Sequence, residues 1–146
     1  MVVGGRRGKM RSLACVLALL AALELRPNNA EAGPLEDARA VSDHGDYQTA
    51  FRLWAALAEQ GDAEAQNALG LMYATGKGVA SVDGNEALKW FRRSADLGNA
   101  AAAVNLGRLY FDGTVLPRDY AAAAEWFRKA AEHGNAAGER LLGNLY

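Results

Sequence analysis

The chain has 146 residues, with 16 Lys and Arg against 17 Asp and Glu. Cys15 is its only cysteine, which excludes a disulfide within the chain and a metal site built from several thiolates. From residue 33 onward there are 11 basic and 15 acidic residues, a net charge of −4 that gives no electrostatic reason to bind nucleic acid.

Residues 1–32 have the pattern of a secretory signal peptide. They begin with four cations: Arg6, Arg7, Lys9 and Arg11. The apolar run LACVLALLAAL at 13–23 follows, and its 11 residues fall short of the roughly 20 that span a bilayer as a helix. Ala30 and Ala32 are the small residues of a cleavage site. We predict cleavage after Ala32, and a periplasmic or secreted mature chain without a transmembrane segment. The alternative is an uncleaved anchor held by the same run.

The rest of the chain contains three copies of one pattern, which we assign to residues 46–82, 83–118 and 119–146. Aligning Ala50, Ala87 and Ala123 produces three columns of identical residues. These columns are Gly61, Gly98 and Gly134; Gly70, Gly107 and Gly143; and Tyr73, Tyr110 and Tyr146. Self-similarity at a period of this length predicts a solenoid of repeated supersecondary units.

Each copy is expected to form two helices. Apolar residues recur at helical spacing in the first, as in Ala50, Phe51 and Trp54. The first helices should begin after an N-cap aspartate, at Asp46, Asp83 and Asp119. They should end at Gly61, Gly98 and Gly134, because glycine takes the left-handed conformation of a helix terminus. The residues that follow these glycines, Asp62, Asn99 and Asn135, are N-caps for the second helices, and the first of these helices should end near Gly76.

The column that contains Gly70 and Gly107 lies inside the second helices, where glycine costs about 1 kcal/mol relative to alanine. A close approach of two helices would compensate for that cost. We expect this approach to involve the further small residues Ala65, Ala102 and Gly138. The aromatic residues Trp54, Phe91 and Phe127 should fill the space beside the crossing.

Four motifs recur in residues 46–146: an aromatic pair, Ala-Glu-x-Gly-[Asp/Asn]-Ala, Leu-Gly-x-x-Tyr, and Gly-x-Gly-Val. Together they resemble the Sel1-like repeat, a relative of the tetratricopeptide repeat. The segment from Leu35 resembles the half-repeat that leads into such arrays in exported bacterial proteins, so residues 33–45 should hold a capping helix at 35–44. The resemblance implies an all-α, right-handed solenoid of helix-turn-helix units that binds other proteins.

Cations fall in register on the first helices, which line the concave side in the family that the chain resembles. The set is Arg52, Lys89, Arg92, Arg93, Arg128 and Lys129. We interpret it as a partner-binding surface for an acidic peptide or an anionic polysaccharide. The alternative is a solvated face paired with Glu86, Asp96, Glu125 and Glu132, since exposed ion pairs are common and contribute little.

The last copy closes on an apolar strip: Leu141, Leu142, Leu145 and Tyr146. Solenoids normally need a polar capping repeat at each end for solubility. We expect the strip to stay partly uncovered and to dock on a partner or on a second copy of the chain. The alternative is a truncated member of a longer array.

No cofactor, metal site or catalytic residue is predicted. His44 and His133 each precede a helix-ending glycine, where a protonated imidazole favours the negative end of the helix dipole. The sequence therefore indicates a non-enzymatic scaffold of the bacterial cell envelope, with a protein or peptide partner. Two alternatives remain: an envelope enzyme that acts on peptidoglycan or lactams through these histidines, and a structural or regulatory subunit of an envelope complex.

Overall fold

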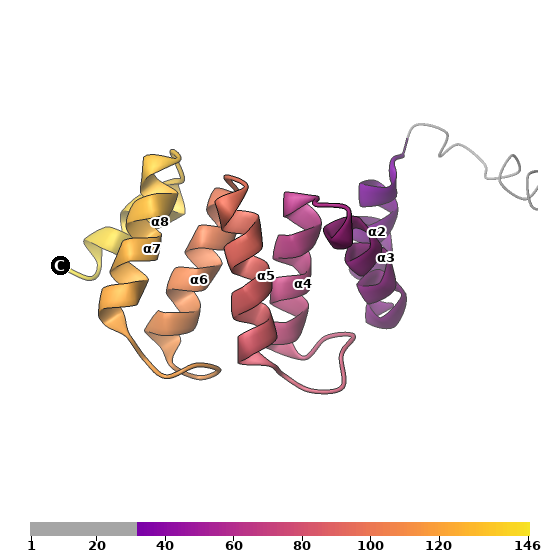
Figure 1. The fold of residues 1–146 in the computed structure, drawn as a ribbon, viewed down its shortest axis with the longest axis horizontal. Helices are drawn as coiled ribbons and strands as arrows, with labels where there is room; N and C mark the ends of the chain where they lie inside the picture. The colour runs from indigo at the N-terminus through magenta and orange to yellow at the C-terminus, as the bar shows by residue number, and fades with distance from the viewer. Residues whose placement is uncertain (1–31) are drawn as a thin grey trace, which may run out of the picture. The chain divides into compact units, whose positions relative to one another are not determined.

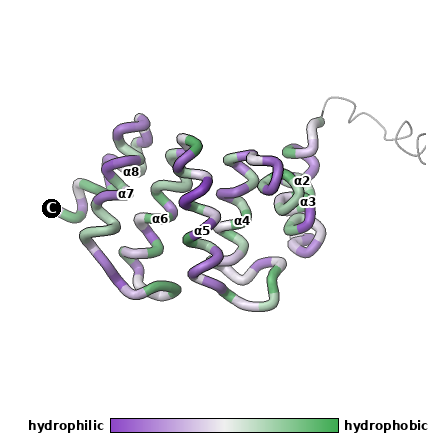
Figure 2. The backbone as a smooth tube through the Cα atoms, in the orientation of Figure 1, coloured by the Kyte–Doolittle hydropathy of each residue, from purple (hydrophilic) through white to green (hydrophobic). Residues whose placement is uncertain are grey.

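Seven helices make up the part of the chain that the computed structural model describes, residues 32–146. They are α2 (Pro34–Asp43), α3 (Tyr47–Glu59), α4 (Ala63–Thr75), α5 (Gly84–Asp96), α6 (Ala100–Asp112), α7 (Tyr120–Glu132) and α8 (Ala136–Gly143). Within residues 33–146 they lie side by side in chain order (Figure 1). Hydrophobic and hydrophilic residues alternate along them, as amphipathic helices require (Figure 2). The prediction of an all-α helical-repeat solenoid is confirmed.

Residues 1–31 of the predicted signal peptide, with Cys15 and the apolar run, lie outside the described residues. Among the helices that are described, none is long and apolar enough to cross a membrane. The helix expected at residues 35–44 lies at Pro34–Asp43 and packs on α3.

The predicted helix ends are confirmed. Asp46, Asp83 and Asp119 each accept a backbone N–H from the first turn of α3, α5 or α7. Asp62, Asn99 and Asn135 do the same for α4, α6 and α8. The three glycines between paired helices have φ of 91°, 90° and 73°, in the left-handed region that favours glycine. These corners turn each first helix back on its second helix.

Two of the three aligned glycines of the second helices, Gly70 and Gly107, lie at the crossing between one repeat and the next, whereas nothing lies within 4 Å of a Cβ built on Gly143. A Cβ built on Gly70 would lie 2.5 Å from Phe91 Cδ1, and one on Gly107 would lie 2.4 Å from Phe127 Cε1. Both phenylalanines are buried. The close approach predicted from the sequence is confirmed, and its partner is the first helix of the following repeat.

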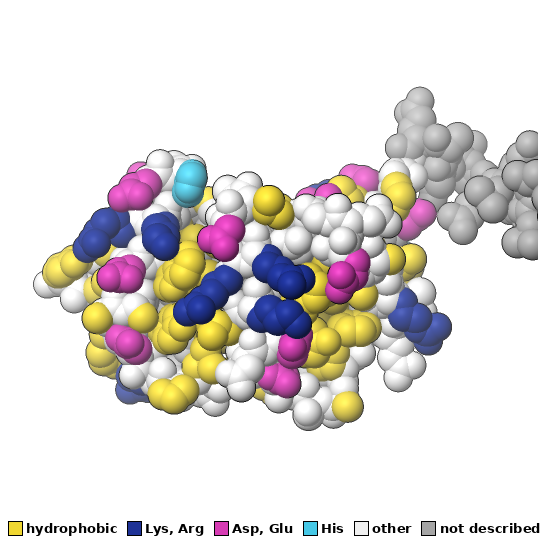
Figure 3. Space-filling view, in the orientation of Figure 1, with side chains coloured by type: hydrophobic (Ala, Val, Ile, Leu, Met, Phe, Trp, Pro, Cys, Tyr) yellow, Lys and Arg dark blue, Asp and Glu magenta, His cyan; other side chains and the backbone are white. Residues whose placement is uncertain are grey.

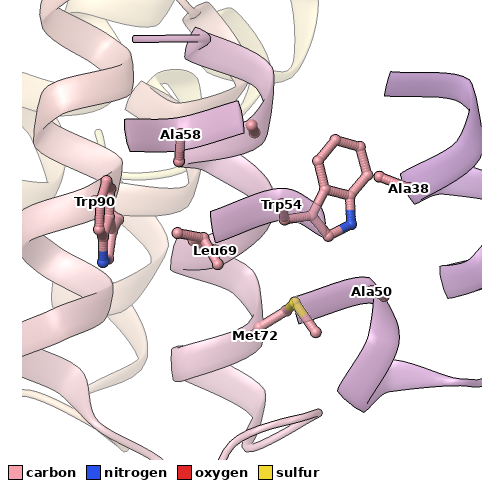
Figure 4. Close-up of a cluster of buried hydrophobic side chains, with 8 residues drawn as sticks. Ala38, Ala50, Trp54, Ala58, Leu69, Met72 and Trp90 are labelled. Carbon is pink, nitrogen blue, oxygen red and sulfur yellow. The ribbon is translucent and has the colours of Figure 1, made fainter. Parts of the chain in front are cut away.

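Two parts of that prediction need correction. Trp54 does not lie on a glycine of a preceding repeat: its indole lies beside Ala38 of α2 (Figure 4), and its Nε1 donates to Ser42 Oγ at 3.0 Å. Gly138 belongs to a different crossing, between α7 and α8, where a Cβ would lie 2.7 Å from Ala130 Cβ. Because no repeat precedes α3 in the described chain, α2 takes the position of a preceding helix.

Polar side chains also join neighbouring repeats. Ser94 of α5 is buried, and its Oγ donates to the carbonyl oxygen of Ala63, at the start of α4. Asn105 of α6 donates from Nδ2 to Asn67 Oδ1 of α4 at 2.9 Å. These bonds fix α4, α5 and α6 relative to one another, and so fix the surface that α5 presents.

Candidate protein-interaction surface

All six cations predicted from the sequence are exposed on α3, α5 and α7. Figure 3 shows Lys and Arg side chains gathered over α5 and α7 on one face of the molecule. These cations contrast with the net negative charge of residues 33–146, and Asp and Glu side chains lie among them on the same face (Figure 3). Local charge of this kind attracts partners of opposite sign.

One cation of each helix lies over a tryptophan three residues earlier. The Arg93 guanidinium carbon is 5.0 Å from the ring centroid of Trp90, and Lys129 Nζ is 4.1 Å from that of Trp126. Contacts between a cation and an aromatic face contribute about 0.5–1 kcal/mol at exposed sites. The two side chains are therefore held along the helix surface.

A second cation of each helix bonds to the repeat's tyrosine. Arg92 Nη2 donates to Tyr110 Oη at 3.3 Å, and Arg128 Nη2 donates to Tyr146 Oη at 3.4 Å. The same arrangement thus occurs twice, one repeat apart. We call the four side chains that share it, Arg92, Arg93, Arg128 and Lys129, the basic row.

No carboxylate of the described residues forms an ion pair with the basic row. Lys89, in contrast, pairs with Glu86 at 3.2 Å. Of the four carboxylates named in the solvated-face alternative, only Glu86 therefore neutralises a predicted cation. The row offers four positive charges, each placed by an aromatic side chain, to an anionic group from outside.

The first repeat lacks this arrangement because Ala55 and Ala56 stand at the positions of Arg92 and Arg93. Tyr73 instead meets Phe51 edge to face, with ring centroids 5.7 Å apart, and burial raises its pKa. Arg52 lies apart from the row, at a hollow of about 660 Å³ formed by the start of α3 and residues 78–80. The structure thus brings four of the six predicted cations together on α5 and α7.

The apolar strip at the end of the last repeat is only partly open. Leu141, Leu142 and Leu145 are half-buried against the cluster around Phe127. Tyr146 is 87% exposed, although its hydroxyl accepts the bond from Arg128. The strip therefore contributes more to the packing of α8 than the sequence suggested.

The two histidines lie at the ends of different helices. His44 Nδ1 is 2.6 Å from the carbonyl oxygen of Ala40 at the end of α2, and His133 is the C-cap residue of α7. Residues 32–146 contain no group of three or more His, Cys, Asp and Glu that could hold a metal ion. The structure provides no shared site for these histidines.

Two features of the surface were missed in the sequence. The aromatic partners of the basic row could have been found, because a cation follows Trp90 and Trp126 at the same three-residue spacing. Gln66 lines a hollow beside Arg93. The sequence marks Gln66 only by a difference between aligned repeats, since Ala103 stands at the equivalent position of the next repeat.

The family model for the Sel1 repeat matches residues 44–62, 63–99 and 100–135. The chain belongs to the Sel1 repeat family. The matches at 63–99 and 100–135 each join a second helix to the first helix of the next repeat, and the match at 44–62 covers α3 alone. The family model therefore divides the same period at a different point from our assignment. Proteins of the Sel1 repeat family generally act as protein-interaction scaffolds and not as catalysts.

Two solved structures of Sel1 repeat proteins are similar to the chain. A Sel1 repeat protein from Oxalobacter formigenes is 34% identical with a TM-score of 0.68, over 86% of this chain and 54% of that one. The protein c5321, a protective antigen of uropathogenic Escherichia coli with an SLR fold, is 41% identical with a TM-score of 0.63, over 68% of this chain and 21% of that one. The chain thus spans about half of the first and a fifth of the second. No curated protein matches it.

Proposed function

We propose that this chain is a scaffold of the bacterial cell envelope that binds an acidic segment of a protein partner through the basic row. The observation that carries the proposal is the row itself. Four cations stand at equivalent positions of α5 and α7, each in contact with an aromatic side chain and none paired with a carboxylate of the described residues.

The aromatic contacts favour binding for a physical reason. Long basic side chains lose rotamer freedom when they are fixed at an interface, at a cost of about 0.5–1.5 kcal/mol each. Arg93 on Trp90 and Lys129 on Trp126 are already restricted in the free protein. An acidic partner would therefore find these charges in place and not yet neutralised.

Crosslinking of the tagged protein in its own cells, followed by mass spectrometry, tests this function. The variant Arg93→Glu/Lys129→Glu reverses one charge on each helix of the basic row. The matched control Arg108→Glu/Arg140→Glu makes the same net charge change on the exposed surfaces of α6 and α8. We expect one dominant partner with the wild type and with the control, and its loss with the basic-row variant.

Capture of that partner by the basic-row variant at wild-type levels would refute the proposal. Capture of only the protein itself would move attention to self-association through Tyr146 and the leucines of α8. Binding should also weaken as ionic strength rises, because salt screens exposed charges over about 8–10 Å at physiological concentrations.

Export is part of the same proposal, and the basic head and short apolar run of residues 1–32 support it. Intact mass of the protein recovered from its own cells provides the test. A species that begins at Gly33 is expected. A recovered species that still carries Met1–Ala32 would contradict cleavage and favour the uncleaved anchor.

A further inference from the structure

One side of α8 repeats a surface that α4 and α6 each bury against the helix that follows. Gly70 of α4 lies under the ring of Phe91, and Gly107 of α6 lies under the ring of Phe127. Gly143 is the third glycine of this column, but it is exposed, and a Cβ built on it meets nothing within 4 Å in the described chain. The two buried copies indicate what fits the third: a phenylalanine on a helix that packs against α8.

α8 has the same orientation in its repeat as α4 and α6 have in theirs. Its small residue Gly138 is buried against Ala130 of α7, and the aligned residues Ala65 and Ala102 are also buried. α8 therefore exposes the side that α4 and α6 turn to the next repeat. We call it the outward side of α8, and it consists of four exposed residues at helical spacing: Ala136, Glu139, Arg140 and Gly143.

Glu139 places a negative charge on this side. It aligns with Gln66 of α4, which lines a hollow together with Arg93 and Asp96 of α5. A helix that packs on α8 as α5 packs on α4 would bring those two positions close to Glu139. Since a carboxylate attracts cations and repels acids across an interface, such a helix should carry basic residues at both, two and five positions after its phenylalanine.

The neighbouring Arg140 stands at the edge of the same surface. It aligns with Asn67, whose Oδ1 accepts from Asn105 of α6, the second helix of the next repeat. A single helix docked on α8 therefore does not have to cover Arg140. The long side chain can extend past such a helix and keep its guanidinium in water.

The folded chain itself does not supply a helix of this kind. Phe91 and Phe127 are each 1% exposed, so α5 and α7 of a second copy have no ring to offer. Five positions after these phenylalanines stand acidic residues, Asp96 and Glu132, which Glu139 would repel. The charge and the ring together favour a different polypeptide.

We propose that the outward side of α8 binds an amphipathic helix of another protein, which places a phenylalanine on Gly143 and basic residues beside Glu139. Binding an amphipathic helix through its apolar face is a common mode of recognition. The basic row lies on α5 and α7 and has no residue in this surface. The two proposals can therefore fail separately.

A labelled helical peptide is the probe. It has the sequence of residues 119–133 with lysine in place of Glu132, so it carries a phenylalanine followed by cations two and five positions later. Short isolated helices are marginal in water. A covalent link between the side chains at positions 121 and 125, which are exposed in α7, therefore keeps the peptide helical.

Fluorescence anisotropy with the full chain measures binding of this peptide. The wild type should bind it, and Gly143→Leu should bind it about five- to hundredfold more weakly, because the leucine takes the place of the ring. Asn144→Leu is the matched control. It should keep wild-type affinity, since the aligned residues Leu71 and Arg108 stay exposed beside the following repeat.

A charge exchange tests the role of Glu139. A second peptide has glutamate at the two basic positions, and the wild type should bind it about two- to tenfold more weakly than the lysine peptide. Glu139→Lys should reverse this preference. The control Glu59→Lys makes the same net charge change at the exposed end of α3 and should keep the wild-type preference.

Four results would overturn the inference. They are no binding of the lysine peptide by the wild type, wild-type affinity in Gly143→Leu, equal binding of a peptide with alanine in place of the phenylalanine, and an unchanged preference in Glu139→Lys. Sedimentation of the protein alone tests the other occupant. A dimer that Gly143→Leu abolishes would assign the outward side of α8 to a second copy and would also overturn the proposal.

Discussion

The absence of a Cβ on Gly70 and Gly107 lets two phenylalanine rings lie directly on the backbone of a neighbouring helix. Each ring is buried, and a Cβ at either glycine would come within 2.5 Å of its carbon atoms. Helix propensity alone would disfavour glycine here by about 1 kcal/mol. Packing of the ring offsets that cost, which explains why the glycine recurs within a helix.

Gly107→Leu should destabilise the protein by about 1–3 kcal/mol, since Phe127 has to move to admit the new side chain. Gly143→Leu is the matched control, because nothing lies within 4 Å of a Cβ built on Gly143. We expect the control to stay within about 0.5 kcal/mol of the wild type. Urea unfolding measures both, and equal stability of the two variants would show that the glycine crossing is wrongly assigned.

Asp46 predicts a pH dependence at the start of α3. Hydrogen bonds from Thr49 lower its pKa below the ordinary value of 3.8. The unfolded chain therefore takes up the proton first on acidification. The stabilisation is complete above the unfolded-state pKa and is lost as the pH falls through the lower folded-state pKa.

The variant Asp46→Asn tests this dependence, because asparagine is an equally good N-cap that does not titrate. Its free energy of unfolding should match that of the wild type at neutral pH and exceed it at acidic pH. The difference between the two proteins removes the effect of all other carboxylates. A difference that does not change with pH would contradict the assignment.

At the scale of the helix, the sequence predicted most of the structure. Helix caps, the corners between paired helices and helix lengths depend on local residue types, and the same residue types recur in each repeat. The partner of a buried ring was harder to predict: Trp54, Phe91 and Phe127 align, yet Trp54 packs on α2. Its environment depends on what precedes the first repeat, which the alignment of repeats does not contain.

The candidate site was predictable in part for the same reason. Positions of the cations follow from the helical period, so the exposure of all six could be inferred. The contacts that the cations make could not be inferred, because contacts such as that of Arg92 with Tyr110 join helices that only the folded chain brings together. The hollow at Gln66 depends on three segments and left only a break in the repeat pattern as a sign.

Phe91→Ala should weaken the interface between α4 and α5 by about 3–5 kcal/mol, since the ring is 1% exposed and fills the space above Gly70. Phe111→Ala serves as the control, because Phe111 is 39% exposed and its ring meets Tyr120 edge to face. Chemical unfolding should show a much smaller loss for the control. Comparable losses would mean that the inter-repeat crossing does not dominate packing at this interface.

For residues 33–146 as a whole, each helix packs chiefly on the helices before and after it in the chain. Three separate clusters of buried residues follow one another along the array, around Trp54, Phe91 and Phe127. Stability in such a protein is close to a sum of repeats and nearest-neighbour interfaces. A local defect should therefore remain local, and binding at α5 and α7 can be weakened without loss of the N-terminal helices.

Hydrogen exchange measured by mass spectrometry on Phe127→Ala tests this locality. The ring lies in the cluster that joins α6, α7 and α8, so exchange should accelerate in α7 and α8. Peptides from α2 to α4 should exchange at wild-type rates, because their packing is centred on Trp54. Equal acceleration in all seven described helices would instead show that residues 33–146 unfold as one cooperative unit. Mutations in the basic row would then have to be checked for global effects before any loss of binding is assigned to charge.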